Sequence, residues 1–157
     1  MKHLLTFLFF AALAFSQPRA THVVISNRTS VTTDKVTLQQ SQTNPQPVAP
    51  VAAVILSTVA GTARVEHSGT APTTTAATPA VTIPGGQASV ISAFTNSNVG
   101  AGTAASITYQ LVPGVPLTLD MTTMGFAGLG TTRNITVVVD LGSTGNVQTA
   151  VYWKEGQ

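Results

Sequence analysis

Few side chains in this chain of 157 residues are of the types that perform catalysis. Beyond residue 16 the histidines are His22 and His67, and neither stands in a nucleophile elbow or in a zinc-binding spacing such as His-x-x-Glu-His. A glycosidase needs two carboxyl groups on either side of one bond. The acids are dispersed along the chain at Asp34, Glu66, Asp120, Asp140 and Glu155. We therefore predict no enzyme, with no catalytic residue, no cofactor and no metal ligand.

A glycine-rich stretch, Gly125–Gly130, is similar in composition to a nucleotide-binding loop. It lacks the order Gly-x-Gly-x-x-Gly, and the pattern after it is that of a strand. A phosphate loop is followed by a helix, whose N-terminus binds the anion. The stretch is better interpreted as a turn that brings Phe126 or Leu129 to the core.

Two sequons, at Asn27 and Asn134, are candidate glycosylation sites. Each asparagine is followed by Thr two positions later, which is the acceptor pattern for N-linked glycans in exported proteins. In a host that does not glycosylate asparagine, Asn27 is an ordinary turn residue.

Charge and cysteine content exclude further classes of protein. Charged residues form 8% of the chain, about a third of the usual share, and the cations are scattered. Nucleic-acid binding requires clustered Lys and Arg, so no nucleic-acid partner is expected. Cysteine is absent, so no disulfide supports the fold, and stability must come from the core or from neighbouring subunits.

The first residues have the pattern of a secretory signal peptide. Lys2 precedes an apolar run over 4–15, and Ala14 and Ser16 supply the small residues of a cleavage site. The run is shorter than the about 20 residues of a membrane-spanning helix, although an uncleaved anchor is the alternative. We predict a signal peptide over 1–16, a secreted or cell-surface location with no transmembrane anchor after cleavage, and one domain over 17–157.

The last quarter of the chain has the clearest strand pattern. Apolar residues alternate over 134–140 and again over 147–153, and a Gly/Ser/Asn stretch over 141–146 separates the two runs. In the second run Val147, Val151 and Trp153 lie on one side, and Gln148, Tyr152 and Lys154 lie on the other. This pattern predicts an antiparallel hairpin with one buried face, anchored by Trp153.

Further strands are expected along the chain, separated by loops rich in Pro and Thr near 41–50 and 68–80. The apolar run 51–59 is interpreted as a buried strand, with a short helix as the alternative. The stretch 68–80 is a surface loop, an O-glycosylated segment or an arm exchanged with a neighbour. The other predicted strands are 23–25, 35–40, 63–67, 88–95, 104–112 and 117–121.

These patterns predict an all-β fold of about seven to nine strands. The expected architecture is an antiparallel β-sandwich, either immunoglobulin-like or jelly-roll. No stretch after the signal peptide has helical periodicity.

The function predicted from these features is that of a secreted structural protein that assembles with itself by β-strand addition. Such a subunit belongs to a filament, a pilus-like fibre or a surface layer, and low charge removes the usual defence of strand edges against pairing. The alternative is a monomeric adhesin or a carbohydrate- or lipid-binding module, with surface glycans as partners and loops 96–102 and 125–133 as the binding region. The candidate assembly strands contain Val23, Val24 and Ile25, and Val54, Ile55 and Leu56.

Overall fold

The computed structural model describes residues 20–40, 48–68, 91–97, 103–104, 107–124 and 134–155. The predicted signal peptide and most of the predicted loops, including 69–80 and Gly125–Gly130, lie outside these residues. So do most residues of the loops proposed for ligand binding.

The described residues form eight strands and no helix. All strand pairs are antiparallel and belong to one sheet, which confirms the predicted all-β antiparallel fold. The strands are β1 (Ala20–Gln40), β2 (Val48–Ser57), β3 (Gly61–Ser68), β4 (Ile91–Thr95), β5 (Thr103–Ala104), β6 (Tyr109–Leu111), β7 (Leu117–Asp120) and β8 (Asn134–Glu155).

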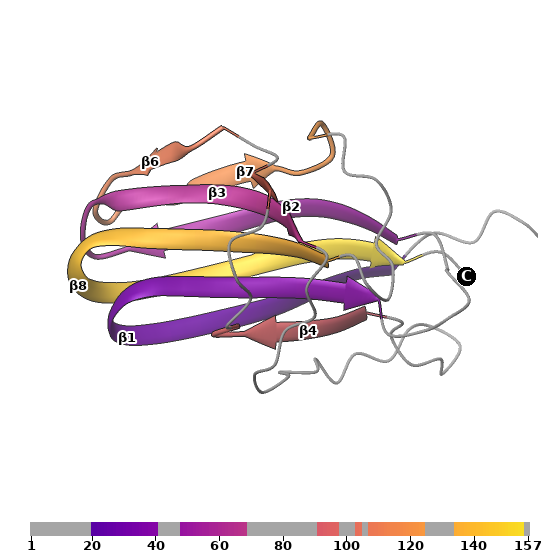
Figure 1. Cartoon of the computed structure of the whole chain (residues 1–157), viewed down its shortest axis with the longest axis horizontal. Coiled ribbons are helices and arrows are strands. Elements are labelled where there is room, and N and C mark those ends of the chain that lie inside the picture. Colours follow the sequence, from indigo (N-terminus) through magenta and orange to yellow (C-terminus); the bar gives the residue numbers. More distant parts are fainter. Residues whose placement is uncertain are drawn as a thin grey trace, which may run out of the picture.

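Two long strands, β1 with 21 residues and β8 with 22, organise the sheet. Both turn back at the same end of the molecule, beside the β2–β3 connection (Figure 1). Residues 20–28 of β1 pair with 147–155 of β8, and 33–39 pair with 134–140, with register shifts between Arg28 and Thr33. The sheet is therefore folded over at these bends, and each long strand contributes to both halves.

The predicted C-terminal hairpin is wrong. Residues 134–140 and 147–153 are two parts of one bent strand, and they pair with β1, β2 and β3 instead of with each other. The alternation of apolar residues is the same in both arrangements, because it records which side chains face the core and not which strand supplies the hydrogen bonds.

The pairings divide the sheet into two layers. The first layer has the order β1 (20–28), β8 (147–155), β2 and β7. The second layer has the order β4, β1 (33–40), β8 (134–140) and β3, with β5 and β6 on the far side of β3. Figure 1 shows the two arms of β1 and of β8 running past each other from the bends.

One hydrophobic core is built from both layers. Val24, Val151 and Trp153 of the first layer and Val36 and Leu38 of the second are all at most 4% exposed. The core contains mainly Val, Leu, Ile and Ala besides Trp153. Trp153 is thus the anchor of the core, as the sequence pattern predicted.

Most of the shorter strands follow the prediction, and one does not. The run 51–59 is mainly strand, since β2 extends to Ser57, and Gly61 begins the returning strand β3. The predicted strand 104–112 is instead two short strands, β5 and β6. Ile107, which lies between these two strands, is 75% exposed.

Candidate functional site

The edge of β1 is the first feature that bears on assembly. Among the described residues, 20–28 pair with β8 on one side and with no strand on the other. Residues 20–27 contain no Lys, Arg, Asp or Glu, the side chains that normally protect a sheet edge. Val24 points into the core, whereas Ile25 is 50% exposed and Val23 partly exposed. The first predicted assembly segment, 23–25, therefore lies on a strand that pairs with β8 on one side and has no partner strand on the other side in the described part of the chain.

The second predicted segment has a different position. Val54 and Ile55 pair with β8 on one side and with β7 on the other, so their strand is internal to the layer. Leu56 pairs with Gln148 of β8 and is 38% exposed. Among the described residues, no strand therefore pairs with the second side of β1 over 20–28, whereas β2 is paired on both sides at Val54 and Ile55.

The two segments lie on either side of β8 and share one surface. Val23 pairs with Tyr152, which pairs with Ala52 on its other side. Ile25 pairs with Ala150, which in turn pairs with Val54. Residues directly opposite in neighbouring strands point to the same side of a sheet, so these form two rows of apolar side chains.

We call this surface, on the side of the first layer away from the core, the outer face. Its residues are at least partly exposed, although most of them are apolar. It consists of Thr21, Val23, Ile25 and Asn27 of β1, Gln148, Ala150, Tyr152 and Lys154 of β8, Ala49, Ala52, Val54 and Leu56 of β2, and Thr118 and Asp120 of β7.

The corresponding face of the second layer has the opposite character. Thr37, Thr136 and Asn134 point away from the core there, and each is at most 1% exposed. Thr37 Oγ1 lies 2.9 Å from Thr136 Oγ1 and 2.7 Å from Ser97 Oγ. The molecule thus buries polar groups on one face and exposes apolar groups on the other.

Two charged residues belong to the outer face, Lys154 and Asp120. The pKa of the Asp120 carboxyl group lies below its ordinary value, because the Thr122 hydroxyl and then the Thr122 backbone N–H donate hydrogen bonds to it. The Oγ1–Oδ1 distance is 2.6 Å and the N–Oδ1 distance 2.9 Å. Asp120 is therefore held ionised at neutral pH, opposite in sign to Lys154.

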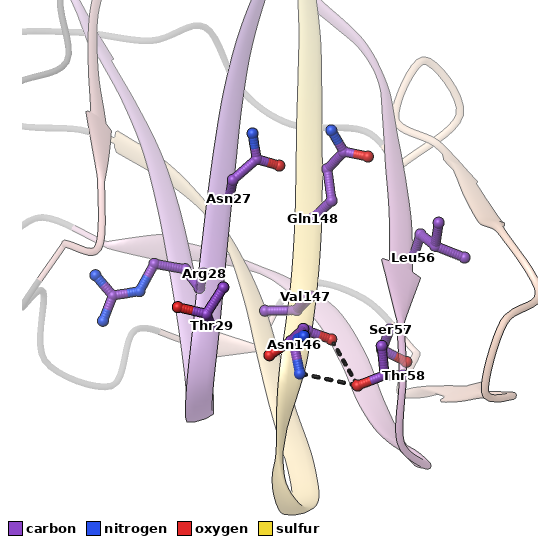
Figure 2. Close-up of a pocket in the computed structure, with 9 residues that line it drawn as sticks. All are labelled: Asn27, Arg28, Thr29, Leu56, Ser57, Thr58, Asn146, Val147 and Gln148. Carbon is purple, nitrogen blue, oxygen red and sulfur yellow. Dashed lines mark hydrogen bonds between the residues drawn. The ribbon is translucent and has the colours of Figure 1, made fainter.

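A pocket of about 210 Å³ lies where the outer face meets the bends. Figure 2 shows Asn27, Gln148 and Leu56 side by side on three adjacent strands, with Asn146 hydrogen-bonded to Thr58 below them. The pocket is also lined by Arg28, Thr29, Ser57 and Val147. Two carboxamides beside an apolar side chain suit a small polar ligand with one apolar face.

The buried carboxyl group of Asp34 connects the two arms of β1 near the bend. Asp34 is 1% exposed and accepts a hydrogen bond of 3.0 Å from Ser26 Oγ on the other arm of the same strand. Its second oxygen accepts a hydrogen bond of 2.8 Å from Thr149 Oγ1 of β8. A buried polar group is tolerated when it is hydrogen-bonded, so this cluster joins the two layers within the core.

A charged group at the surface of the second layer connects β3 and β8. Arg64 donates hydrogen bonds to Asp140 and, over 2.6 Å, to Glu66 Oε1. The pKa of the Arg64 guanidinium lies above its ordinary value, first because of the hydrogen bond to Asp140 and further because of Glu66. Since both acids share one cation, this is the geometry of a structural ion pair.

Two of the sequence-predicted acids, Glu66 and Asp140, come together at Arg64, whereas the described side-chain contacts of Asp34 and Asp120 are with hydroxyl groups and one backbone amide. His22 is buried and stacks on Trp153, with the ring centroids 5.5 Å apart. Among the residues that the structure describes, no three His, Asp or Glu side chains lie close enough together to hold a metal ion.

The two sequons have different environments. Asn27 is exposed on the outer face beside the pocket. Asn134 is 0% exposed, so this structure leaves no room for a glycan there. Glycosylation of either asparagine remains a prediction, and Asn27 has the more accessible side chain.

No known family model matches the chain, and comparison with curated proteins gives no significant match. In the described part of the chain, no helix has the length and apolar character needed to cross a membrane. The candidate site therefore rests on the geometry of the outer face and of the β1 edge.

Sequence reasoning missed several residues of the outer face. It placed the side chains of Tyr152 and Lys154 on the side of the strand away from Trp153, which is correct. It did not connect these two residues with Val23, Ile25 and Val54. The alternation of apolar and polar residues predicted the side of the strand to which each side chain points. The pairing that brings them together depends on a register between segments over 100 residues apart, and no local pattern encodes it.

Proposed function

We propose that the chain is a secreted structural protein that assembles with itself, as a subunit of a filament, a pilus-like fibre or a surface layer. The observation that carries this proposal is the charge-free edge of β1 over 20–27, which has no second strand in the described residues. An exposed edge of this kind is a template for pairing with another chain.

The same proposal assigns the folded-over sheet to the jelly-roll class of β-sandwich. The pairings β1 with β8, β2 with β7 and β3 with β6 are nested, as in a long hairpin that is folded over on itself. An immunoglobulin-like sandwich has different strand neighbours, so the nesting favours the jelly-roll alternative. Jelly-rolls occur in shells built from many copies of one subunit, which agrees with a structural role.

In strand addition, β1 of one copy pairs with β1 of another in antiparallel orientation. When this pairing is centred on Val24, Thr21 of one copy lies opposite Asn27 of its partner. Both side chains are exposed, and like charges placed directly opposite each other in a sheet are destabilising. The double variant Thr21→Lys/Asn27→Lys is therefore designed to block the edge and to leave the core intact.

The test is light scattering after size-exclusion chromatography, with negative-stain microscopy of the same samples. We expect the natural chain to associate into dimers or larger species, and the double variant to associate much more weakly. Thr58→Lys adds a charge at the exposed β2–β3 connection and is the control. A sharp monomer at high concentration of the natural chain would refute the proposal.

The pocket beside Asn27 supports a second candidate function, that of a monomeric adhesin or carbohydrate-binding module. The carboxamides of Asn27 and Gln148 beside Leu56 match the mixed polar and apolar surface of a sugar ring (Figure 2). A glycan screen with the natural chain tests this candidate. Binding that Gln148→Ala abolishes would favour it over assembly, and the absence of any binding would leave it without support.

A further inference from the structure

The outer face has a regular grid of side chains that the register defines. One row runs Val23, Tyr152, Ala52 and Asp120, across all four strands of the first layer. The next row runs Ile25, Ala150, Val54 and Thr118. Lys154 lies one row before Tyr152 on β8.

Standard sheet spacings give the positions of the charged residues on this grid. Neighbouring strands are about 4.8 Å apart, and residues on one face of a strand repeat about every 6.8 Å. Lys154 and Asp120 are two strands and one row apart, which is about 12 Å, so the two side chains of one copy are too distant for a direct ion pair.

Val23 and Val54 are separated by the same step of two strands and one row. One line in the plane of the face, passing midway between Tyr152 and Ala150, therefore bisects both pairs. A twofold rotation about this line exchanges the positions of Lys154 and Asp120 and also those of Val23 and Val54. The face is thus complementary to itself in charge and in apolar surface.

We propose that a second copy of the chain docks face to face on the outer face about this twofold axis. Lys154 of each copy then lies opposite Asp120 of the other, and Val23 of each lies opposite Val54. Such a contact is isologous, since the same surface is used on both subunits. The two charges cancel within the face, so two copies meet without like-charge repulsion.

This inference rests on the proposed function, and it supplies something that edge pairing lacks. Antiparallel pairing of β1 with β1 of another copy is also twofold, so by itself it ends at a dimer. A second, different twofold surface on each subunit joins one edge-paired dimer to the next. Edge and outer face together therefore extend an assembly beyond a dimer.

A charge-reversal cycle tests the proposal, measured by sedimentation of the natural chain and its variants at equal concentration. We expect the natural chain to form species larger than a dimer, and Lys154→Glu and Asp120→Lys to stop at the edge-paired dimer, because each reversal places two like charges in contact. The double reversal Lys154→Glu/Asp120→Lys restores opposite signs, and we expect it to restore the larger species.

The control is Ser143→Glu, which adds an acid at the exposed bend of β8, away from the outer face. It should leave the larger species unchanged. Circular dichroism and thermal unfolding confirm that every variant is folded, so a loss of the larger species reports the interface.

The outcomes separate this inference from the proposed function. Larger species that are unchanged in both single reversals, or no rescue by the double reversal, would overturn the face-to-face contact. If the natural chain stops at a dimer, and Thr21→Lys/Asn27→Lys weakens that dimer, the face contact is refuted and strand addition stands. If the natural chain does not associate at all, both proposals fail.

Discussion

Trp153 and Tyr152 are neighbours on β8 and point to opposite sides of the first layer. Trp153 is 0% exposed and stacks on His22, whereas Tyr152 is partly exposed on the outer face. Replacement of each by Ala therefore separates the core from the proposed interface. Both variants remove a large aromatic side chain, one position apart on the same strand.

The expected losses of stability differ several-fold. A buried aromatic side chain removes about 200 Å² from water, which at about 25 cal/mol per Å² sets an upper limit near 5 kcal/mol for Trp153. Large-to-small replacements of buried aromatics cost about 3–5 kcal/mol, and we expect about 4 kcal/mol for Trp153→Ala. Tyr152→Ala should cost less than about 1.5 kcal/mol in the monomer, because its side chain is already partly in water.

Urea unfolding followed by far-ultraviolet circular dichroism measures both variants, since Trp153 is the only tryptophan and its fluorescence is lost on replacement. With a slope of about 2 kcal/mol per molar urea, Trp153→Ala should lower the midpoint by about 2 M. Trp153→Phe is the milder variant if the Ala replacement does not fold. A monomer that loses as much stability from Tyr152→Ala as from Trp153→Ala would refute the assignment of the two faces.

Three further predictions concern the bends, the buried carboxylate and the pH range of assembly. Gly61→Ala should lower the free energy of unfolding by at least about 2 kcal/mol, because a Cβ there would collide with the backbone oxygen of Asp140. Gly142→Ala is the milder control in the same urea assay, since its Cβ would lie 3.3 Å from one carbonyl oxygen. Asp34→Ala should cost about 3 kcal/mol in thermal unfolding, because two buried hydroxyls lose their hydrogen-bond acceptor. Thr33→Ala, at the exposed neighbouring position, should be nearly neutral. The pKa of Asp120 is lowered from its ordinary value of 3.8. The contribution of Asp120 to the face-to-face contact should therefore be complete above about pH 3.8 and be lost only as the pH falls through the lowered pKa. Sedimentation that shows this loss already at about pH 5 would contradict the ion pair.

The sequence was sufficient for the class of fold and for much of the core. Alternation of apolar residues predicted correctly that Val147, Val151 and Trp153 are buried and that Gln148 and Lys154 face solvent. It succeeded because side-chain direction in a strand is a local property with a period of two residues.

The path of the chain at the bends was not predictable from the same pattern. The stretch 141–146 was interpreted as a hairpin loop, because Gly, Ser and Asn are typical turn residues. In the structure these residues belong to one bent strand, with Gly145 still paired to Val31 of β1. Partners far along the chain decide between a hairpin and a bent strand, and local composition does not distinguish the two.

The candidate assembly surface was predictable in part. Val23 and Ile25 were singled out as residues of an assembly strand, and the structure places them on β1, which in this part of the described chain pairs only with β8. Val54 was expected on a second such strand, but β7 occupies that side of β2. Because β2 pairs with β7, the backbone of Val54 is already hydrogen-bonded on that side, while its side chain stays partly exposed. Val54 therefore belongs to the proposed face-to-face contact and not to a pairing edge.

Hydrogen exchange of the backbone amides of β1 tests the central claim most directly. The account predicts that, as the concentration of the natural chain rises, edge-facing amides within 20–28 become protected, whereas amides of 36–39, which pair with both β4 and β8, keep their exchange rates. Exchange within 20–28 that does not depend on concentration would contradict assembly through this edge.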